Sequence, residues 1–310
     1  MIAARRGAAG ERIAASDVAI AAQLACLLEA SAPKPGNVSP GRHFSDLRYE
    51  DFLASAAAIG APIAEAGARP LGATVRLAVE ATARWTASNA NLGIVLLLAP
   101  LARAALTGAG DSDLRAGVRC VLDATTIDDA RDVYAAIRLA APGGLGRVDD
   151  QDIADEPTRT LIDVMRLAAE RDAIAREYAT AFELTFLTGV PALERARADG
   201  LAWDAAAVET FLALLAAADD THVARRAGAA ASAEVSRRAR AAIAAGGVRT
   251  AHGRDVIERM DRALRDPRHL ANPGSAADLT AAAIFVVLLG GGWHSSRGAA
   301  AHGGRDAASR

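Results

Sequence analysis

Lysine is almost absent from this chain of 310 residues. Among its 35 lysine and arginine side chains, Lys34 is the only lysine. Arginine therefore supplies nearly all of the positive charge. The single lysine has either survived by chance or occupies a position where a planar guanidinium cannot replace a compact ammonium. Composition alone leaves both interpretations open.

Cysteine and aromatic residues are also scarce. Cys26 and Cys120 have no CxxC spacing, which argues against a disulfide scaffold or a zinc ribbon and favours a reducing cytoplasm. Phe, Trp and Tyr make up 4% of the residues, too few for a platform that stacks single-stranded bases. The formal net charge is -2 and no basic stripe stands out, so we expect no nucleic-acid partner.

Long apolar runs are missing. The longest, Leu92–Ala102 and Leu279–Leu289, span 11 residues each, whereas a membrane span needs about 20. Glu11, Arg12 and Asp17 interrupt the N-terminal segment, which therefore lacks the apolar stretch of a signal peptide. Hydrophobic residues make up 52% of the chain, enough for a sizeable core. We therefore expect a cytoplasmic protein without a membrane span.

Helical periodicity dominates the sequence. Apolar residues recur at helical spacing, and the abundant alanine favours helices and is depleted in strands. We expect an all-α protein with a single globular multi-helix domain over residues 1–294 and a disordered tail over residues 295–310. The predicted helices cover about residues 13–30, 49–59, 71–85, 93–106, 128–140, 157–182, 203–217, 221–245, 249–265 and 276–289.

Five polar segments rich in glycine or proline interrupt these helices. The first, residues 33–46, holds Lys34 between two prolines that keep its backbone extended. An ammonium on a stiff loop suits phosphate, and His43 and Asp46 could add a proton donor and a metal ligand. An ordinary helix connector with a solvated lysine explains the same residues.

The second segment, residues 88–93, contains two asparagines, Asn89 and Asn91. Their amides could orient a ligand. They could equally cap the helix that follows, because asparagine is a preferred N-cap residue.

The third segment, residues 142–147, contains Gly144 and Gly146, whose backbone N–H groups could form an anion nest. An acidic cluster over residues 149–152 follows and could hold a hydrated Mg²⁺. A glycine C-cap followed by an acidic N-cap accounts for the same pattern.

The fourth segment, residues 219–228, gathers acid, hydroxyl, imidazole and guanidinium groups, among them Asp220, Arg225 and Arg226. These side chains could bind phosphate and a metal. The alternative is an Asp N-cap followed by a charged helical face.

The fifth segment, residues 272–280, places Asp278 at the start of a helix that soon becomes strongly apolar. A carboxylate near a core boundary needs a partner. A cation such as Mg²⁺ would serve, and so would backbone N–H groups at the helix start.

In this order the five segments carry the motifs PKPGN, NANLG, GGLG, DTHVARRAG and NPGSAADLTA. The combination resembles the triphosphoribosyl-dephospho-CoA synthase family, from about Leu24 to Trp293. The first and last motifs are the most specific, because family members carry a Pro-Lys-Pro-Gly loop early and a Pro-Gly-x-x-Ala-Asp helix start late. The family is all-α, which agrees with the helical periodicity.

The resemblance implies a transferase that joins ATP to 3′-dephospho-CoA, forms 2′-(5″-triphosphoribosyl)-3′-dephospho-CoA and releases adenine. A hydroxyl displaces adenine at C1 of the ATP ribose, so the reaction is glycosyl transfer and the phosphates are retained. Such a reaction builds oxocarbenium character, which a carboxylate stabilises, while the triphosphate calls for Mg²⁺ and cationic side chains. The implied partners are small molecules, and a homo-oligomer remains an open alternative.

The resemblance also implies roles for individual residues. The ammonium and guanidinium groups would hold phosphate, the asparagines would orient substrate, and the glycines would let the backbone approach it closely. The implied catalytic or magnesium-binding carboxylates are Asp46, Asp220 and Asp278. The implied substrate- and phosphate-binding residues are Lys34, Gly36, Asn37, His43, Asn89, Asn91, Gly144, Gly146, Arg225 and Arg226.

One motif departs from the family pattern. Well-known bacterial members carry Asn-Thr-His-Lys-Gly where this chain has Asn89-Ala90-Asn91-Leu92-Gly93, so an imidazole and an ammonium are lost. This version resembles a divergent branch in archaea and methylotrophic bacteria. It leaves two alternatives open: an ATP-dependent enzyme that assembles a C1-carrier cofactor of the methanofuran or methanopterin type, and a non-catalytic helical binding protein.

Overall fold

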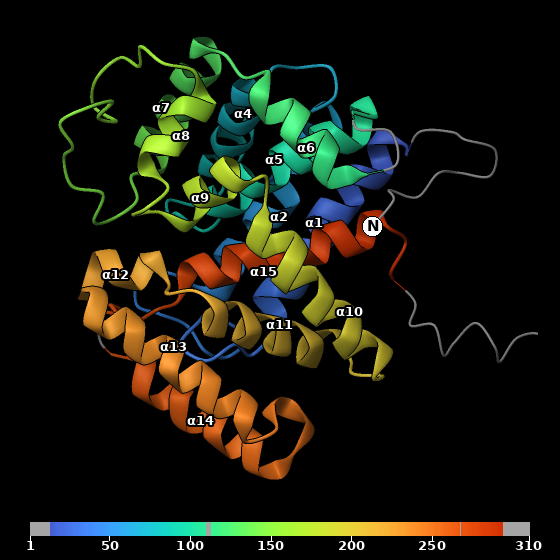
Figure 1. Cartoon of the computed structure of the whole chain (residues 1–310), viewed down its shortest axis with the longest axis vertical. Helices are drawn as coiled ribbons and strands as arrows, with labels where there is room; N and C mark the ends of the chain where they lie inside the picture. The colour runs from blue at the N-terminus through green and yellow to red at the C-terminus, as the bar shows by residue number, and fades with distance from the viewer. Residues whose placement is uncertain (1–12, 110–112, 267, 294–310) are drawn as a thin grey trace, which may run out of the picture.

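The computed structural model describes residues 13–109, 113–266 and 268–293, and every regular element in this part of the chain is helical (Figure 1). An isolated antiparallel bridge between Ser39 and Arg42 is the one strand-like pairing among these residues. The predicted all-α class is confirmed. The predicted tail, residues 295–310, lies outside the described residues, so the predicted domain boundary stays a prediction.

The helices follow one another with short connections. Their bounds are α1 Ala15–Ser31, α2 Tyr49–Ala58, α3 Gly60–Ala64, α4 Leu71–Ala83, α5 Leu92–Thr107, α6 Leu114–Asp123, α7 Ile127–Ala140, α8 Leu161–Ala168, α9 Ala173–Thr180, α10 Val190–Ala198, α11 Trp203–Ala217, α12 Thr221–Ala227, α13 Ala229–Ala244, α14 Ala251–Leu264 and α15 Gly274–Leu289, with a π-helical turn Thr185–Gly189 and a 3₁₀ turn Gly247–Arg249. The sequence did not predict α3, α6 or α10.

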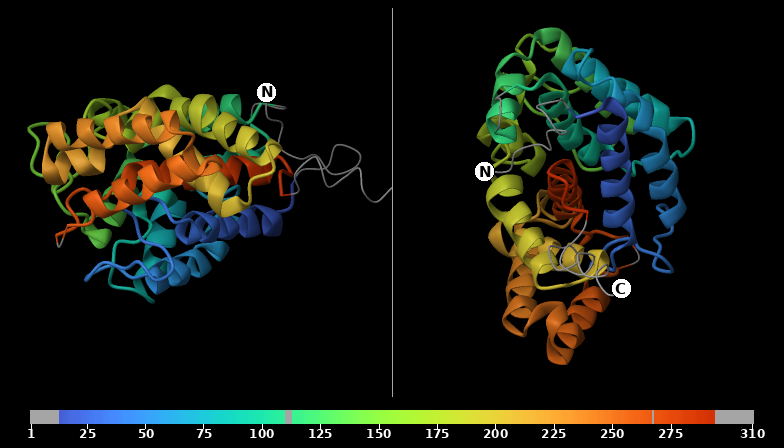
Figure 2. Two further views of the ribbon diagram at one scale, coloured as in Figure 1. Left: turned by 90° about the horizontal axis from the view of Figure 1, so that it is seen from below. Right: turned by 90° about the vertical axis from the view of Figure 1, so that its right-hand side faces the viewer.

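Helix α15 is the centre of the fold. The right-hand view of Figure 2 shows it nearly end-on, with the other helices around it. Every residue of α15 is buried except Gly274, Asp278 and Leu288. A helix that is apolar on all sides needs neighbours on all sides, and α15 packs against α1, α5, α10 and α11. In Figure 1, helices α4–α9 lie on one side of it and α10–α14 on the other.

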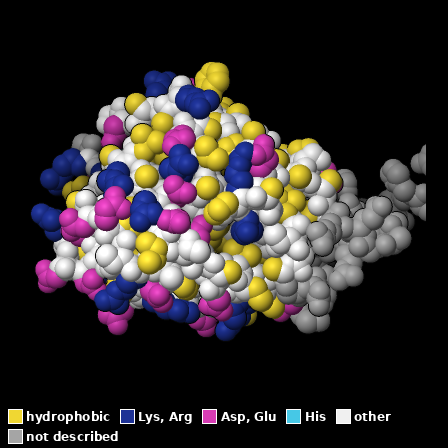
Figure 3. Space-filling view, turned by 90° about the horizontal axis from the view of Figure 1, so that it is seen from above, with side chains coloured by type: hydrophobic (Ala, Val, Ile, Leu, Met, Phe, Trp, Pro, Cys, Tyr) yellow, Lys and Arg dark blue, Asp and Glu magenta, His cyan; other side chains and the backbone are white. Residues whose placement is uncertain are grey.

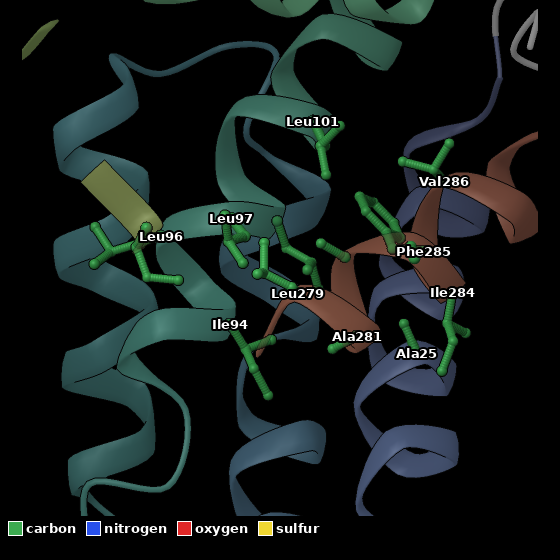
Figure 4. Close-up of a cluster of buried hydrophobic side chains, with 14 of the residues drawn as sticks. Ala25, Ile94, Leu96, Leu97, Leu101, Leu279, Ala281, Ile284, Phe285 and Val286 are labelled. Atoms are coloured by element: carbon green, nitrogen blue, oxygen red, sulfur yellow. The ribbon is translucent and has the colours of Figure 1, made fainter. Parts of the chain in front are cut away.

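The core fixes the position of the first turn of α15. Figure 4 shows Leu97 and Leu101 of α5 near Phe285 and Leu279 of α15, and all four side chains are buried. Each such side chain stabilises the fold by about 1.5–3 kcal/mol. The apolar turns therefore hold the helix rigidly, and Asp278 projects from its start at a defined place.

The segment 157–182, predicted as one long helix, forms two helices, α8 and α9. Asp172 caps α9, because its carboxylate accepts a hydrogen bond from Ala175 N at 3.0 Å. The backbone N–H groups of Arg171 and Asp172 both turn back to the Ala168 carbonyl at 3.0 Å. The turn between the helices brings polar residues into an otherwise apolar segment.

The segment 221–245 is also divided, into α12 and α13. The break falls at Gly228, whose φ of 92° lies outside the helical region. Glycine adopts this angle without the steric cost that other residues pay. The break allows the short helix α12 to end beside α15 before α13 begins.

Charged side chains are mixed on the face seen in Figure 3, where basic and acidic groups alternate with apolar ones. No patch of one sign covers this face. Among the described residues, no helix combines the length and the apolar character that crossing a bilayer requires.

Candidate functional site

A cavity of about 790 Å³ opens between α5, α7, α8, α9, α12 and the start of α15. Its size is within the range of sites that take drug-sized ligands. One wall is apolar and consists mainly of side chains from α5, α7, α8 and α9. The other wall is polar and comes from α12, the first turn of α15 and the loops at 44–47 and 87–89. Residues 141–153 close a further side.

The first and last motifs of the sequence meet in the structure. Asn37 Nδ2 donates to Asn272 Oδ1 at 3.0 Å, and Gly36 N donates to buried Asp261 Oδ1 at 2.8 Å. A Cβ on Gly36 would lie 2.8 Å from Leu264 Cβ, and its φ is 73°. Gly36 and Asn37 therefore join the early loop to the segment before α15, and neither lines the cavity.

Lys34 lies away from the cavity that the phosphate prediction requires. It is fully buried, and its Nζ lies 2.9 Å from Glu29 Oε1. The same ammonium donates to the carbonyls of Glu29 and Ala32 near the C-terminal end of α1. A cation is favourable at that end of a helix. The flanking prolines fix the backbone, but the side chain turns inward, so the phosphate role stays a prediction without support from its position.

Glu29 is itself buried, and neither of its carboxylate oxygens accepts a well-directed hydrogen bond. The distance to Lys34 defines an ion pair, so charge attraction holds the two groups together. This buried pair is electrically balanced.

Asp278 is placed differently. Its carboxylate lines the cavity, and no described residue donates a hydrogen bond to it. Burial raises its pKa well above the ordinary value, and the carboxylates of Glu29, Asp220 and Asp172 raise it further, while Arg225 opposes them. A carboxylate in these surroundings favours a cation or a hydrogen-bond donor from a ligand.

Gly93 explains how Asp278 reaches this position. A Cβ on Gly93 would collide with both atoms Oδ2 and Cγ of Asp278. The glycine of the NANLG motif is therefore needed for space, and only its lack of a side chain lets α5 and α15 approach so closely.

Asp220 does not face the cavity. Its carboxylate caps α12 by accepting from Val223 N at 3.0 Å, and it accepts from Ala276 N of α15 at 2.8 Å. Burial raises its pKa to about 6. Both oxygens thus accept hydrogen bonds from backbone donors and join α12 to α15. The metal role of Asp220 stays a prediction without support from this position.

His222, the imidazole of the fourth segment, lines the cavity although it was not among the implied site residues. Its backbone N donates to Ser275 Oγ at 3.1 Å, and its ring packs against Gly274, where a Cβ would lie 3.0 Å from Nδ1. Burial first, and then Arg225 and Arg226, lower its pKa to about 4. The imidazole is therefore neutral near pH 7 and can accept a hydrogen bond.

Arg225 and Arg226 both line the cavity, and their phosphate-binding role stays a prediction. Arg225 Nη1 lies 2.6 Å from Asp172 Oδ2. Arg226 donates to the Arg268 carbonyl at 2.9 Å and lies 3.5 Å from His222 Nε2. Contacts within the protein thus orient both guanidinium groups beside the cavity.

The remaining predicted residues of the early loop, Asp46 and His43, lie in different places. Asp46 lines the rim of the cavity, 74% exposed, with Oδ1 3.7 Å from His269 Nε2. His269 also lines the cavity, and its ring packs at a tilt of 32° against that of Phe44, with 3.9 Å between the ring centroids. His43 is exposed and accepts from Tyr49 N at 3.2 Å, so it lies at the start of α2 and not in the cavity.

The two predicted asparagines, Asn89 and Asn91, also lie in different places. Asn89 lines the cavity, and its Oδ1 accepts from Leu92 N at 3.3 Å. Asn91 is buried behind the wall, where its Nδ2 donates to Thr82 Oγ1 at 3.0 Å. Leu92 itself contributes to the apolar lining.

The Gly-rich loop borders the cavity. Gly144 and Gly146 have φ angles of 81° and 67°, and Gly146 lines the cavity whereas Gly144 does not. The acidic cluster behind them does not converge on a metal. Asp152 accepts from Val148 N at 2.8 Å and closes a turn, and Asp150 pairs with Arg159.

Within the described part of the chain, no three His, Cys, Asp or Glu side chains come together as metal ligands. Asp46, Asp220 and Asp278 thus do not form a metal cage. Mg²⁺ needs less than a cage, because it commonly binds one or two carboxylates and substrate phosphate. The uncommitted Asp278, with its acidic neighbours, fits a magnesium ion that arrives with a triphosphate.

The chain matches the family model described as "CitG: ATP:dephospho-CoA triphosphoribosyl transferase" over residues 15–297. It therefore belongs to this family, and the predicted resemblance is confirmed.

Similar proteins carry related names. A probable 2-(5″-triphosphoribosyl)-3′-dephosphocoenzyme-A synthase of Pseudomonas paraeruginosa is 40% identical over 111 residues, 35% of this chain and 37% of that protein. One of Pseudomonas syringae is 31% identical over 159 residues, 51% and 53% of the two chains. The matches thus span about half or less of these relatives. A crystal structure from Archaeoglobus fulgidus, provisionally named triphosphoribosyl-dephospho-CoA synthase, has a TM-score of 0.60 and 29% identity, covering 77% of this chain and 99% of that one.

Proposed function

We propose that this protein transfers the triphosphoribosyl group of ATP to a hydroxyl of 3′-dephospho-CoA and releases adenine. The observation that carries the proposal is the Asp278 carboxylate, which lines the same cavity as Arg225 and Arg226 and receives no hydrogen bond from any residue that the structure describes. Family membership gives the reaction class. The cavity supplies a negative group for the sugar and positive groups for its phosphates.

The chemistry follows from these charges. The hydroxyl oxygen of the acceptor forms a bond to C1 of the ribose, the C1–N bond to adenine breaks, and the bonding electrons leave with the base. The proton lost by the hydroxyl balances the proton that the released adenine takes up on its nitrogen. Positive charge develops on the ribose during this exchange, and a fixed carboxylate stabilises it. Asp278 is suited to this role because no described residue donates a hydrogen bond to its carboxylate and α15 fixes its position.

The polar wall orients the other groups. Arg225 and Arg226 attract the phosphates, and guanidinium groups bind them in a planar, two-pronged geometry. His222, neutral near pH 7, accepts a hydrogen bond from a substrate hydroxyl. Mg²⁺, bound with the triphosphate, would offset phosphate charge next to Asp278.

The apolar wall contributes by excluding water. Side chains such as Leu96, Ile137 and Met165 line that side. Water would compete with the acceptor hydroxyl for the reactive ribose, and its exclusion also strengthens the electrostatic interactions within the site.

One chromatographic experiment tests the proposal. Purified protein is incubated with Mg-ATP and 3′-dephospho-CoA, and free adenine and the triphosphoribosylated product are quantified together. We expect equal amounts of both, with a strong decrease for Asp278→Asn. Release of ADP or AMP without adenine, or no turnover next to an active family enzyme, would overturn the proposal.

A different acceptor is the second candidate, since the motif that departs from the family lies at the site. Leu92 lines the cavity where well-known members have lysine, and Asn91 is turned away toward Thr82. The polar wall thus lacks one ammonium, which would suit an acceptor with less phosphate, such as a C1-carrier precursor. Adenine release with that acceptor and none with 3′-dephospho-CoA would favour this candidate.

A further inference from the structure

Arg171 is a cavity residue that none of the five motifs contains. It lies in the turn between α8 and α9, immediately before the α9 cap Asp172. Its backbone is fixed, because its N–H donates to the Ala168 carbonyl at 3.0 Å. Its side chain is exposed and lines the cavity. The guanidinium is thus carried on a defined turn at the cavity surface.

The guanidinium of Arg171 makes few hydrogen bonds or ion pairs with the described residues. Its one described hydrogen bond runs to the Leu167 carbonyl at 3.5 Å. None of the described carboxylates pairs with it, whereas Arg225 is paired with Asp172. Of the three arginines that line the cavity, Arg171 is therefore the one least committed to internal contacts.

Asp278, Arg225 and Arg171 also differ in their surroundings. Asp278 lies in the wall formed by the buried helix α15, and Arg225, whose side chain is 21% exposed, lies near enough to oppose the shift in its pKa. Arg171 is more exposed than Arg225. The cavity therefore presents a carboxylate on α15, a half-buried arginine near it and a more exposed arginine on the turn between α8 and α9.

We infer that Arg171 binds the terminal phosphate of the nucleoside triphosphate and so makes the site selective for three phosphates over one. The inference rests on the proposed function, which puts the ribose at Asp278. A 5′-triphosphate then extends outward, past Arg225 to the cavity mouth. Its last phosphate meets Arg171, with which none of the described carboxylates pairs.

Calorimetry with Mg²⁺ complexes of ATP, ADP and AMP tests this assignment. We expect Arg171→Met to weaken ATP binding about tenfold, to weaken ADP binding less and to leave AMP binding unchanged, because one charge-assisted contact is lost. Arg171→Lys should recover part of the ATP affinity. The matched control is Arg166→Met, on α8 and exposed, which does not line the cavity and should change none of the three affinities.

Kinetics provides the second measurement. A contact far from the reacting carbon acts equally in the ground state and in the transition state, so Arg171→Met should raise KM for ATP and leave kcat unchanged. Equal weakening of all three nucleotides, or unchanged ATP affinity, would overturn the inference. The nucleotide affinities of Arg171→Met could follow the expected pattern while the wild-type protein releases no adenine. That result would refute the proposed function and leave the inference standing.

Discussion

Two charged groups at helix ends, Glu29 of α1 and Asp278 of α15, differ in what surrounds them. At the end of α1, the charge of Glu29 is balanced by Lys34, whose ammonium also reaches two backbone carbonyls. At the start of α15, Asp278 receives no hydrogen bond from a described residue and faces the cavity. The balanced pair supports the fold. The unbalanced carboxylate is maintained by the fold for a ligand, since burying a charge without a partner is costly.

The largest expected effect comes from breaking the balanced pair. Lys34→Met should lower the free energy of unfolding by about 3–5 kcal/mol, because Glu29 would remain buried without its cation. Urea unfolding of the purified protein measures the loss. The double variant Lys34→Met/Glu29→Leu should recover most of the stability. A single variant as stable as wild type would show that the pair does not support the fold.

Removing the unbalanced charge should do the opposite. Asp278→Asn should reduce the rate of adenine release about 10²–10³-fold, because the developing charge on the ribose loses its carboxylate. Its unfolding free energy should stay the same or rise, since the repulsion from neighbouring carboxylates disappears. A decrease in stability with unchanged activity would show that Asp278, like Lys34, supports the fold and does not act in the reaction.

Gly93→Ala probes the space that Asp278 occupies. The added methyl group would collide with the carboxylate, so we expect a loss of about 1–3 kcal/mol in stability, together with reduced turnover. Gly143→Ala is the control, because a Cβ there meets no atom within 4 Å. In an Asp278→Ala background the same Gly93 change should cost much less, and an undiminished cost would place the clash elsewhere.

His222 should give the smallest effect, visible in the pH dependence of stability. Its pKa is lowered from 6.5 to about 4 in the folded state, so the unfolded chain binds the extra proton as the pH falls below about 6.5 and the folded state loses stability. His222→Gln should therefore lose about 1–2 kcal/mol less than wild type between pH 7.5 and pH 5. The opposite contribution of Asp220, whose pKa is raised, is present in both proteins and cancels in the comparison.

Urea unfolding at the two pH values measures this difference. His252→Gln is the matched control, because His252 is exposed on α14 and lies outside the cavity. Identical pH slopes for wild type and His222→Gln would mean that the His222 ring is protonated as readily in the folded protein as in the unfolded chain.

The sequence predicted the helices well where apolar periodicity is strong. The bounds of α11 match the prediction, and α5, α7 and α15 start or end within a residue or two of it. It failed where a single residue outweighs the periodicity. Asp172 divides one predicted helix by capping its second half, and Gly228 divides another by its positive φ. Periodicity averages over a window and does not register such local effects.

The residues of the site could be predicted only in part from the sequence. Motifs indicated which segments matter, and Asp278, Arg225, Arg226 and Asn89 do line the cavity. Motifs could not give the direction of a side chain, so the inward turn of Lys34 was missed. Nor could they indicate which neighbours contribute, because Arg171 lies in none of the five motifs and lines the cavity only through the fold.

Helix α15 has one more consequence. Asp278 stands on its first turn, while the turns that follow form the centre of the core. Heat that loosens the centre must therefore displace the carboxylate in the same event. Thermal inactivation and loss of helical circular dichroism should fall on a single curve, and the protein would pass on heating directly from active to unfolded, without an inactive but folded form.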